Sequence, residues 1–287
     1  MNASIAPQDP WPCLERARRR RTPRVPFLVD GEVVGSVAAE HVDALVPFAP
    51  ALRLDGQAVH LAVERARRDG ALAEVNRALH AQGLVRAWRD ETYAIVQRHG
   101  EQARALIERA AARFWGTLTF GAHANGYVAD AHGRPTHLWI ARRSWTKPTD
   151  PGLLDNLVGG GVPHGQTPLE CLVREGWEEA GLDAALMQRA QPHSVVVLDC
   201  DIAEGLQREH LYVFDLALPH DVQPRNQDGE VAECRLMPVA EALAAAAAGE
   251  MTVDASLATL DFALRHGLLA APQAQRLASA FNQLKLA

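Results

Sequence analysis

The sequence predicts an α+β protein of two domains, and two observations carry this prediction. Residues 1–115 mix short strand-like and helix-like segments, whereas residues 116–287 are dominated by β-prone segments around one well-marked helix at 168–180. The 287 residues are also enough for two ordinary domains. We therefore expect a smaller α+β N-terminal domain over residues 1–115 and a second domain, with C-terminal helices, over residues 116–287.

Composition limits the class of protein. Hydrophobic residues make up 48% of the chain and charged residues 22%, as in ordinary globular proteins. The net charge of −6 argues against nucleic-acid binding through phosphate contacts. No apolar run approaches the length of about 18 residues that a membrane span needs, and none follows the arginines at 18–21 as a signal peptide requires. The four cysteines form no CxxC pair, which favours reduced thiols. We expect a cytoplasmic protein that binds neither nucleic acid nor membranes.

The N-terminal domain is predicted to begin with a β-hairpin. Residues 26–29 and 32–37 are strand-like and flank Asp30-Gly31, a dipeptide typical of hairpin turns. The following segments are predicted, in order, as a short helix at 38–46, a strand at 52–54, a helix at 59–82 divided by Gly70, a strand at 88–97 and a helix at 102–114. This domain carries no catalytic constellation of its own, and a role in substrate binding or at an interface is left open for it.

The second domain is predicted to be rich in strands. The expected strands are 118–128, 137–143, 153–158, 194–200, 207–218 and 231–237, and the expected C-terminal helices are 240–248, 254–265 and 272–286. The strand at 153–158 runs into the glycines at 159–161, which we expect to form a flexible loop ahead of the helix at 168–180.

The helix at 168–180 has a clear signal at each end. Thr167 is a natural N-cap, Pro168 suits the first helical position, and Glu170 completes a capping box. Gly181 is suited to end the helix in a left-handed turn. The expected core-facing stripe consists of Leu169, Val173, Trp177 and Ala180.

Three glutamates lie on the opposite face of this helix, within an arc of about 100°. They are Glu175, Glu178 and Glu179. Carboxylates this close repel one another and can all stay ionised only with water or a cation among them. Hard divalent ions such as Mg²⁺ take carboxylate ligands together with substrate phosphates. The alternative is an ordinary solvated acidic helix face.

The segment 159–182 resembles the signature of the Nudix hydrolases. That signature is Gly, five residues, Glu, seven residues, Arg-Glu, an aliphatic residue, any residue, Glu-Glu, any residue, Gly and an aliphatic residue. The residues in register with it are Gly160, Arg174, Glu175, Glu178, Glu179, Gly181 and Leu182. Gln166 stands where the first Glu is usual, and Gly176 replaces the aliphatic residue.

The resemblance implies an α/β/α sandwich for the second domain and metal-dependent hydrolysis of a pyrophosphate bond. By this resemblance Glu175, Glu178 and Glu179 hold Mg²⁺ or Mn²⁺, and the carbonyl of Gly159 is a further ligand. Arg174 pairs with one of the glutamates and holds it in place. Glu230 lies where many Nudix enzymes have another acidic residue, so it is a candidate ligand or general base. Its alternative role is that of an ordinary surface glutamate.

Seven further residues are candidates for substrate binding. Arg142, Arg143 and Lys147 are basic and could grip phosphate. His123, Tyr127 and Trp145, together with Trp139, could stack on a flat heterocycle. The alternatives are a surface role for the basic residues and core packing for the rings.

Flanking segments narrow the resemblance to one subgroup. Segments 88–91, 123–127, 147–156, 226–231 and 256–269 resemble the proteins related to thiamine pyrophosphokinase fusions, in which a distinctive N-terminal domain precedes a Nudix domain. That subgroup is linked to hydrolysis of oxidised thiamine diphosphates to monophosphates.

The substrate implied by this subgroup is thiamine diphosphate or its oxidised forms. One alternative is a nucleoside diphosphate-linked compound such as ADP-ribose. Another is a ligand sensor that does not hydrolyse, which Gln166 favours. Substrate choice is expected to lie in the loops and the N-terminal domain. A homodimer is left open.

Overall fold

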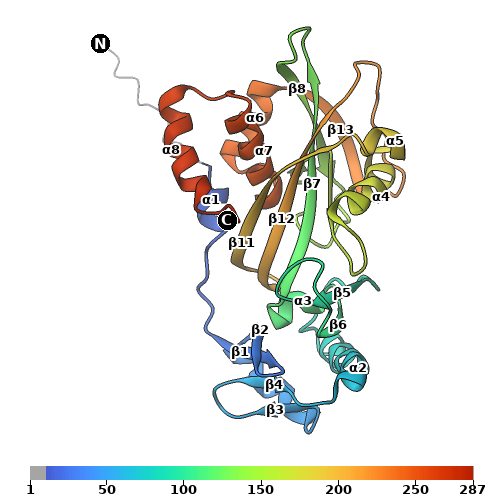
Figure 1. Cartoon of the computed structure of the whole chain (residues 1–287), viewed down its shortest axis with the longest axis vertical. Helices are drawn as coiled ribbons and strands as arrows, with labels where there is room; N and C mark the ends of the chain where they lie inside the picture. Colours follow the sequence, from blue (N-terminus) through green and yellow to red (C-terminus); the bar gives the residue numbers. More distant parts are fainter. Residues whose placement is uncertain (1–10, 287) are drawn as a thin grey trace.

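The computed structural model describes residues 11–286 and has two sheet-containing regions stacked along its long axis (Figure 1). The region of residues 24–115 lies at one end, and the large sheet of residues 118–238 with its helices lies at the other. The α+β fold class is confirmed. Within residues 11–286, no helix is long and apolar enough to cross a membrane.

The N-terminal region contains a four-stranded sheet in the order β2-β1-β4-β3. The elements of the whole region are β1 (Arg24–Val29), β2 (Glu32–Ala38), the 3₁₀ helix η1 (Ala39–Phe48), β3 (Leu52–Leu54), β4 (Val59–Leu61), η2 (Arg65–Arg67), α2 (Arg68–Ala81), β5 (Thr92–Ile95), β6 (Ala105–Glu108) and α3 (Ala111–Trp115). The β1–β2 hairpin around Asp30-Gly31 is confirmed. The buried side chains of Phe27, Leu72 and Trp115 belong to one core that joins the sheet to α2 and α3.

Two helix predictions in this region are wrong. Residues 59–61 form β4, which pairs with β1 and β3, so the helix begins only at Arg68 and runs through Gly70. Residues 105–108 form β6, which pairs with β5, and only 111–115 are helical. In both segments pairing with another strand outweighs the local helical pattern.

The second region is built on a sheet whose main path is β11-β12-β7-β8-β13. Its strands are β7 (Leu118–Ala129), β8 (Pro135–Arg143), β9 (Leu154–Asp155), β10 (Val158–Gly161), β11 (Gln191–Ile202), β12 (Gly205–Ala217) and β13 (Val231–Pro238). β7 runs parallel to β12 and antiparallel to β8 and β10. The glycines at 159–161 therefore belong to a strand, and the predicted glycine loop is wrong.

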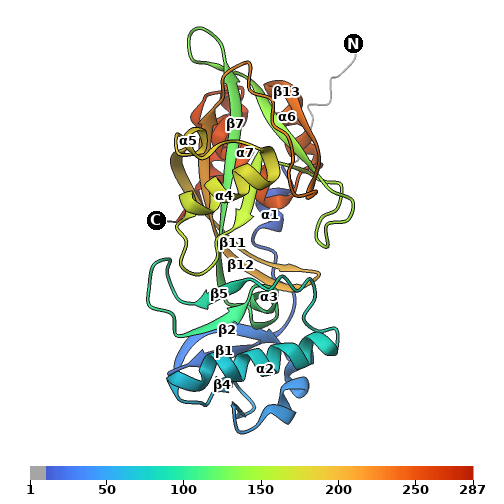
Figure 2. The ribbon, with the colours of Figure 1, turned by 90° about the vertical axis from the view of Figure 1, so that its right-hand side faces the viewer.

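Helices cover both faces of this sheet (Figures 1 and 2). α4 (Pro168–Ala180) and α5 (Ala184–Met187) pack on one face, over a core that includes Leu172 and Met187. On the other face lie α6 (Val239–Ala248), α7 (Val253–Arg265), α8 (Ala271–Asn282) and the short α1 (Cys13–Arg16), which share a second core. This layering fixes α4 beside the strand β10.

Candidate active site

The helix α4 has both predicted caps. The side chain of Thr167 accepts a hydrogen bond from the backbone N–H of Glu170 at 3.2 Å, and the carboxylate of Glu170 accepts one from the N–H of Thr167 at 2.7 Å. Gly181 ends the helix in the left-handed conformation with φ of 62°. These caps fix the register of the helix, and hence the direction of each glutamate.

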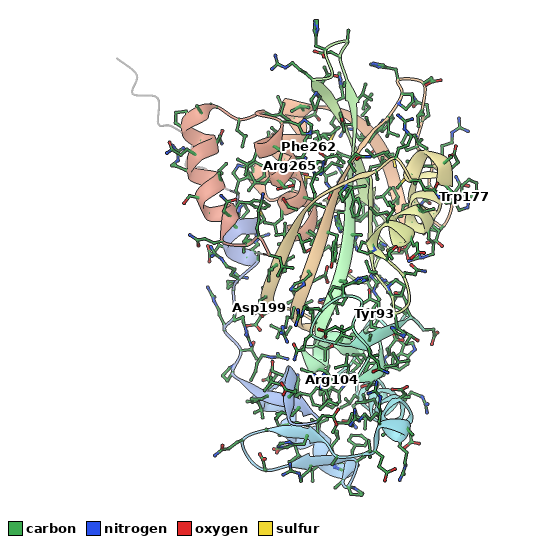
Figure 3. The ribbon with its side chains drawn as sticks, viewed as in Figure 1. Tyr93, Arg104, Trp177, Asp199, Phe262 and Arg265 are labelled. Carbon is green, nitrogen blue, oxygen red and sulfur yellow. The ribbon has the colours of Figure 1, made fainter. Side chains whose placement is uncertain are left out.

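The predicted core-facing stripe of α4 is wrong at Trp177, which is 56% exposed and points away from the sheet (Figure 3). Ala180 is buried as predicted, and Leu169 and Val173 are half-buried against the same core. The buried face also carries Cys171, Leu172, Glu175, Gly176 and Glu179. Two of the glutamates therefore point toward the strand β10, and the helix packs its acidic side inward.

The glycines of β10 make this packing possible. A Cβ atom on Gly160 would overlap the carboxylate of Glu175, and one on Gly159 would come within 2.9 Å of the His123 ring. A Cβ on Gly161 would overlap the hydroxyl of Tyr93. Three side chains from other elements thus lie directly on the three glycines of this strand, which have no side chains of their own.

Burial changes the ionisation of the inward glutamates. It raises the pKa of Glu179 well above the ordinary value, and the charge of Glu175 adds to this effect. The backbone N–H of Gly159 donates to Glu179 at 2.9 Å and opposes the rise. Burial also raises the pKa of Glu175, although the charge of Arg174 opposes it. Both carboxylates therefore lie where added positive charge would stabilise their ionised forms.

Arg174 lies between the glutamates. Its guanidinium donates to Glu175 Oε1 and to Glu178 Oε2, each at 2.8 Å, and it lies 3.9 Å from the carboxylate of Glu91. The predicted pairing of Arg174 with a signature glutamate is present. Glu91 comes from the N-terminal region, so the acidic face of α4 contacts both regions of the chain.

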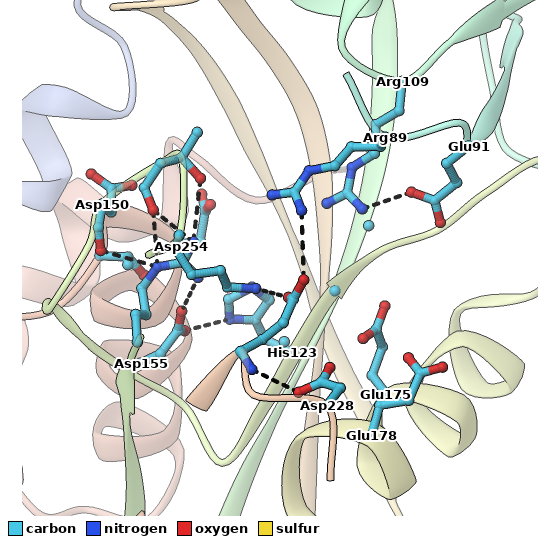
Figure 4. A pocket seen from close by; sticks show the side chains of 18 of the residues that line it. Arg89, Glu91, Arg109, His123, Asp150, Asp155, Glu175, Glu178, Asp228 and Asp254 are labelled. Carbon is cyan, nitrogen blue, oxygen red and sulfur yellow. Dashed lines mark hydrogen bonds and ion pairs between the residues drawn. The ribbon is translucent and has the colours of Figure 1, made fainter. Parts of the chain in front are cut away.

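A cleft of about 420 Å³ opens at this face (Figure 4). The second region contributes the glycines 159–161, Arg174, Glu175 and Glu178 to its walls. The N-terminal region contributes Arg89, Asp90, Glu91, Tyr93, Arg109 and Arg113. The cleft therefore has walls from both regions of the chain.

Comparisons with known proteins decide the family. The model of the NUDIX domain matches residues 119–255, and the model of the Domain of unknown function (DUF4743) matches residues 12–119. Nudix hydrolase 24, chloroplastic, of Arabidopsis thaliana is 36% identical over 252 residues, which cover 85% of this chain and 68% of the relative. The chain belongs to the Nudix hydrolases.

One further relative and one solved structure are similar to this Nudix hydrolase. Nudix hydrolase 20, chloroplastic, of Arabidopsis thaliana is 35% identical and covers 85% of this chain and 68% of its own length. The crystal structure of DR0079 from Deinococcus radiodurans is 24% identical, covers 56% of this chain and 92% of its own, and has a TM-score of 0.41. The family reaction is hydrolysis of a pyrophosphate bond. The domain boundary at 115/116 and the cytoplasmic location stay predictions.

Three of the seven predicted substrate-binding residues line the cleft of the Nudix hydrolase. They are His123, Arg143 and Lys147. Arg143 donates to Asp155 at 2.9 Å and to the carbonyl of Thr149 at 2.9 Å, so it holds the neighbouring loop. Its guanidinium is therefore already occupied.

Arg142, Tyr127 and Trp145 do not line the cleft, so the cleft gives no support to their predicted role in substrate binding, which stays a prediction. Arg142 donates to the carbonyl of Gly152, and Trp145 is 71% exposed beside that glycine. Tyr127 contacts Phe262 of α7, on the opposite side of the sheet from α4. Trp139 is buried in the core, which agrees with core packing, the alternative to stacking on a substrate.

Glu230 lies in the cleft as an ion-paired residue. It binds Lys147, and Arg89 lies 3.5 Å from its other oxygen. Burial alone would raise the pKa of Glu230, but the hydrogen bond and charge of Lys147 outweigh burial and lower it. Glu230 is therefore ionised at neutral pH.

The donor set of the cleft fits the divalent ion that Nudix hydrolases generally use. Within residues 11–286, no three acidic, histidine or cysteine side chains converge closely enough to bind one ion together. The glutamates nevertheless supply hard oxygen donors, and burial leaves Glu175 and Glu179 in need of positive charge. The carbonyl of Gly159 lies on the same strand that packs against both of them.

The sequence favours a part for the N-terminal region in substrate choice, but it does not indicate which of its residues line the cleft. Arg89, Glu91, Tyr93 and Arg109 lie there because the β5–β6 hairpin and the turn before it reach the glycine strand. The sequence marks the Trp88–Glu91 segment only by its resemblance to the thiamine pyrophosphokinase-related subgroup. Nothing in its local pattern indicates which cleft these side chains enter, since that depends on packing between segments about 70 residues apart.

Proposed function

We propose that this Nudix hydrolase cleaves the pyrophosphate bond of an organic diphosphate with Mg²⁺ or Mn²⁺, and that thiamine diphosphate or its oxidised forms are converted to the monophosphate. The thiamine assignment is supported by the resemblance of segments 88–91, 123–127 and 147–156 to the thiamine pyrophosphokinase-related subgroup. The first and last of these segments and His123 contribute residues to the cleft wall, which supports a link between this resemblance and substrate binding.

One observation carries the metal-dependent part of the proposal. Glu175 and Glu179 are 8% and 6% exposed and lie against Gly160 and Gly159, and Glu175 lines the cleft together with Glu178. Such buried carboxylates are costly unless a cation or donors compensate them. A divalent cation held by Glu175, Glu178, Glu179 and the Gly159 carbonyl would neutralise diphosphate charge and help to activate water.

The other residues act by positioning and by proton transfer. Arg174 keeps Glu175 and Glu178 on the cleft side of the helix. Glu230, which is ionised, accepts a proton from the attacking water or serves as a further ligand. Lys147 and Arg89 limit the repulsion between Glu230 and an incoming diphosphate.

Replacing Glu178 tests the proposal. Its side chain is 37% exposed, so we expect Glu178→Gln to remove metal-dependent hydrolysis without loss of folding. The measurements are phosphate release with Mg²⁺ or Mn²⁺ and the thermal unfolding midpoint. Glu74→Gln, at an exposed helical site outside the cleft, is the control and should leave turnover unchanged. Undiminished turnover in Glu178→Gln would reject the assignment.

The rival function is a Nudix-fold sensor, and Gln166 is the feature that suggested it. Gln166 lines a separate cavity with His99 and Phe120, so its replacement of the usual Glu leaves the three signature glutamates in place. Metal titration by calorimetry followed by a hydrolysis panel separates the two functions. The panel compares oxidised thiamine diphosphates with ADP-ribose and nucleotide sugars. Metal binding without any phosphate release would favour the sensor.

A further inference from the structure

A second cavity of about 440 Å³ adjoins the cleft on the side of the N-terminal region. The two cavities share seven wall residues, among them Arg89, Tyr93 and Arg109, so they are compartments of one cleft. The second compartment is bounded by Ala87, Ala110 and the hairpin tip at 202–204. It contains none of the signature glutamates, so a group bound there would lie beside the glutamates and not among them.

A strained turn places Arg89 in the wall shared by the two compartments. Ala87 and Asp90 on either side of it both have φ of 57°, a left-handed conformation that is costly for residues with side chains. The indole N–H of Trp88 donates to Asp90 at 2.7 Å, and the backbone N–H of Arg89 donates to Glu108 at 2.8 Å. These bonds fix the turn, and the direction of Arg89 with it.

Arg89 is the arginine in this shared wall that is least committed to a partner. Arg109 donates to Glu91 at 2.7 Å, and Arg113 donates to Glu209 at 2.8 Å. Among residues 11–286, the side chain of Arg89 has only a 3.5 Å ion pair with Glu230, and it is 27% exposed. A phosphate offers two or more acceptor oxygens to a planar guanidinium. It therefore competes well with Glu230 for Arg89, because the Arg89–Glu230 ion pair is long.

We propose that the second compartment, which both regions of the chain line, selects the substrate: Arg89 of the N-terminal region grips the diphosphate, and the compartment receives the organic group. This inference rests on the proposed hydrolysis of an organic diphosphate. Ala87, Ala110 and Pro148 offer apolar surface, and Asp150 and Glu204 offer polar acceptors. The matching organic group is a compact ring system with one apolar face and hydrogen-bond donors at its edge.

Two substitutions test separately the contact of Arg89 with the diphosphate and the binding of the organic group in the second compartment. Arg89→Ala removes the guanidinium and keeps the backbone bond to Glu108. Ala203→Trp adds bulk at an exposed hairpin tip that lines the second compartment and leaves the core untouched. The matched controls are Arg134→Ala and Ala131→Trp, both at the exposed β7–β8 turn outside the cleft. The readouts are KM and kcat for the best organic diphosphate and the inhibition constant of inorganic pyrophosphate, all with Mg²⁺.

The expected results differ for the two variants. Arg89→Ala should raise both KM and the pyrophosphate inhibition constant by roughly ten- to a hundredfold, since a hydrogen bond to a charged group is lost. Ala203→Trp should raise KM at least tenfold and change the pyrophosphate constant less than twofold, because pyrophosphate has no organic group. Both controls should match the wild type.

Two results would overturn the inference while the proposed function stands. They are an unchanged KM in Ala203→Trp, and an unchanged pyrophosphate constant in Arg89→Ala, with an active wild type. A wild type that hydrolyses no organic diphosphate with Mg²⁺ or Mn²⁺ would instead reject the proposed function, and this inference with it.

Discussion

Gly160 shows how one residue without a side chain sets the geometry of the site. The carboxylate of Glu175 occupies the space that a Cβ on Gly160 would need. Glu175 can therefore lie on the strand β10, within reach of the cleft, only while position 160 is glycine. The requirement is steric, since Gly160 does not have the left-handed backbone that demands glycine for conformational reasons.

Gly160→Ala should therefore impair activity more than stability. A displacement of about 1 Å in a catalytic group can cost on the order of a hundredfold in rate. The added methyl group should also cost about 1–3 kcal/mol of stability through overpacking. The measurements are kcat/KM and urea unfolding. Gly70→Ala is the control, because a Cβ there meets nothing and lies in the helix α2, where it should add up to about 1 kcal/mol. Equal activity in both variants would contradict this account.

Asp254 predicts a pH dependence of stability. Burial raises its pKa from 3.8 to about 6, and the charge of Glu209 adds to the rise. The folded state therefore binds the proton more tightly than the unfolded state. The stability that this proton provides is complete below pH 3.8 and is lost as the pH rises through about 6.

Asp254→Asn should remove this loss of stability at rising pH. The free energy of unfolding of the variant, relative to the wild type, should rise between about pH 4 and pH 8 by on the order of 1–3 kcal/mol. Urea unfolding at several pH values measures the difference. A difference between variant and wild type that is constant with pH would show that Asp254 has no raised pKa.

At this scale the sequence predicted residue types better than their positions. Glu175, Glu178 and Arg174 are together because helical spacing brings them together. His123 and Tyr127 are both on β7 and on the same side of it, yet only His123 lines the cleft. Tyr127 lies farther along the strand, where its neighbours belong to α7. Local sequence does not reveal how far along a strand a cleft extends.

The packing of α4 on α5 explains the unusual Gly176. A Cβ at Gly176 would lie 2.6 Å from the sulfur of Met187, which is completely buried. Met187 thus fills the space that the usual aliphatic side chain of the signature would take. The helical cost of a glycine, about 1 kcal/mol against Ala, is offset by burial of a larger side chain from another helix.

Gly176→Val and Met187→Ala should compensate each other. Alone, the first overpacks the contact and should cost about 1–3 kcal/mol, and the second leaves a cavity and should cost about 2–5 kcal/mol. Together they should cost less than the sum, with a coupling of about 0.5–3 kcal/mol. Urea unfolding of the four proteins measures the cycle. Strict additivity would mean that the two side chains do not compete for one space.

Elements with strong local signals were predicted well, and short strands that depend on pairing with another strand were not. The capped α4 and the Asp-Gly hairpin have residues that fix their own ends. β4, β6 and β10 are three or four residues long and exist because another strand pairs with them. The glycines of β10 have poor strand propensity, so no propensity argument could predict that strand.

At the scale of the molecule, two distant segments cover the edge of the large sheet. β11 is the last strand in the sheet order, so its outer backbone groups would be free to pair with another chain. The N–H of Asp199 donates to the carbonyl of Ala17 at 2.8 Å, and that of Val197 donates to the carbonyl of Leu284 at 2.7 Å. This cover argues against a dimer formed across β11, and the homodimer stays a prediction.

Removing the C-terminal part of this cover should promote association. A chain ending at Gln283 loses the Leu284 side chain and also frees the N–H of Val197 on the sheet edge. Leu284→Ala loses the side chain alone, at about 2–5 kcal/mol, and keeps the backbone bond. The light scattering of each protein is measured at the same number of degrees below its own unfolding midpoint, so that the difference in stability does not affect the comparison. The shortened chain should scatter more than Leu284→Ala, because an exposed strand edge templates pairing between chains. Equal scattering would mean that the segment acts through its side chain and not by covering the edge.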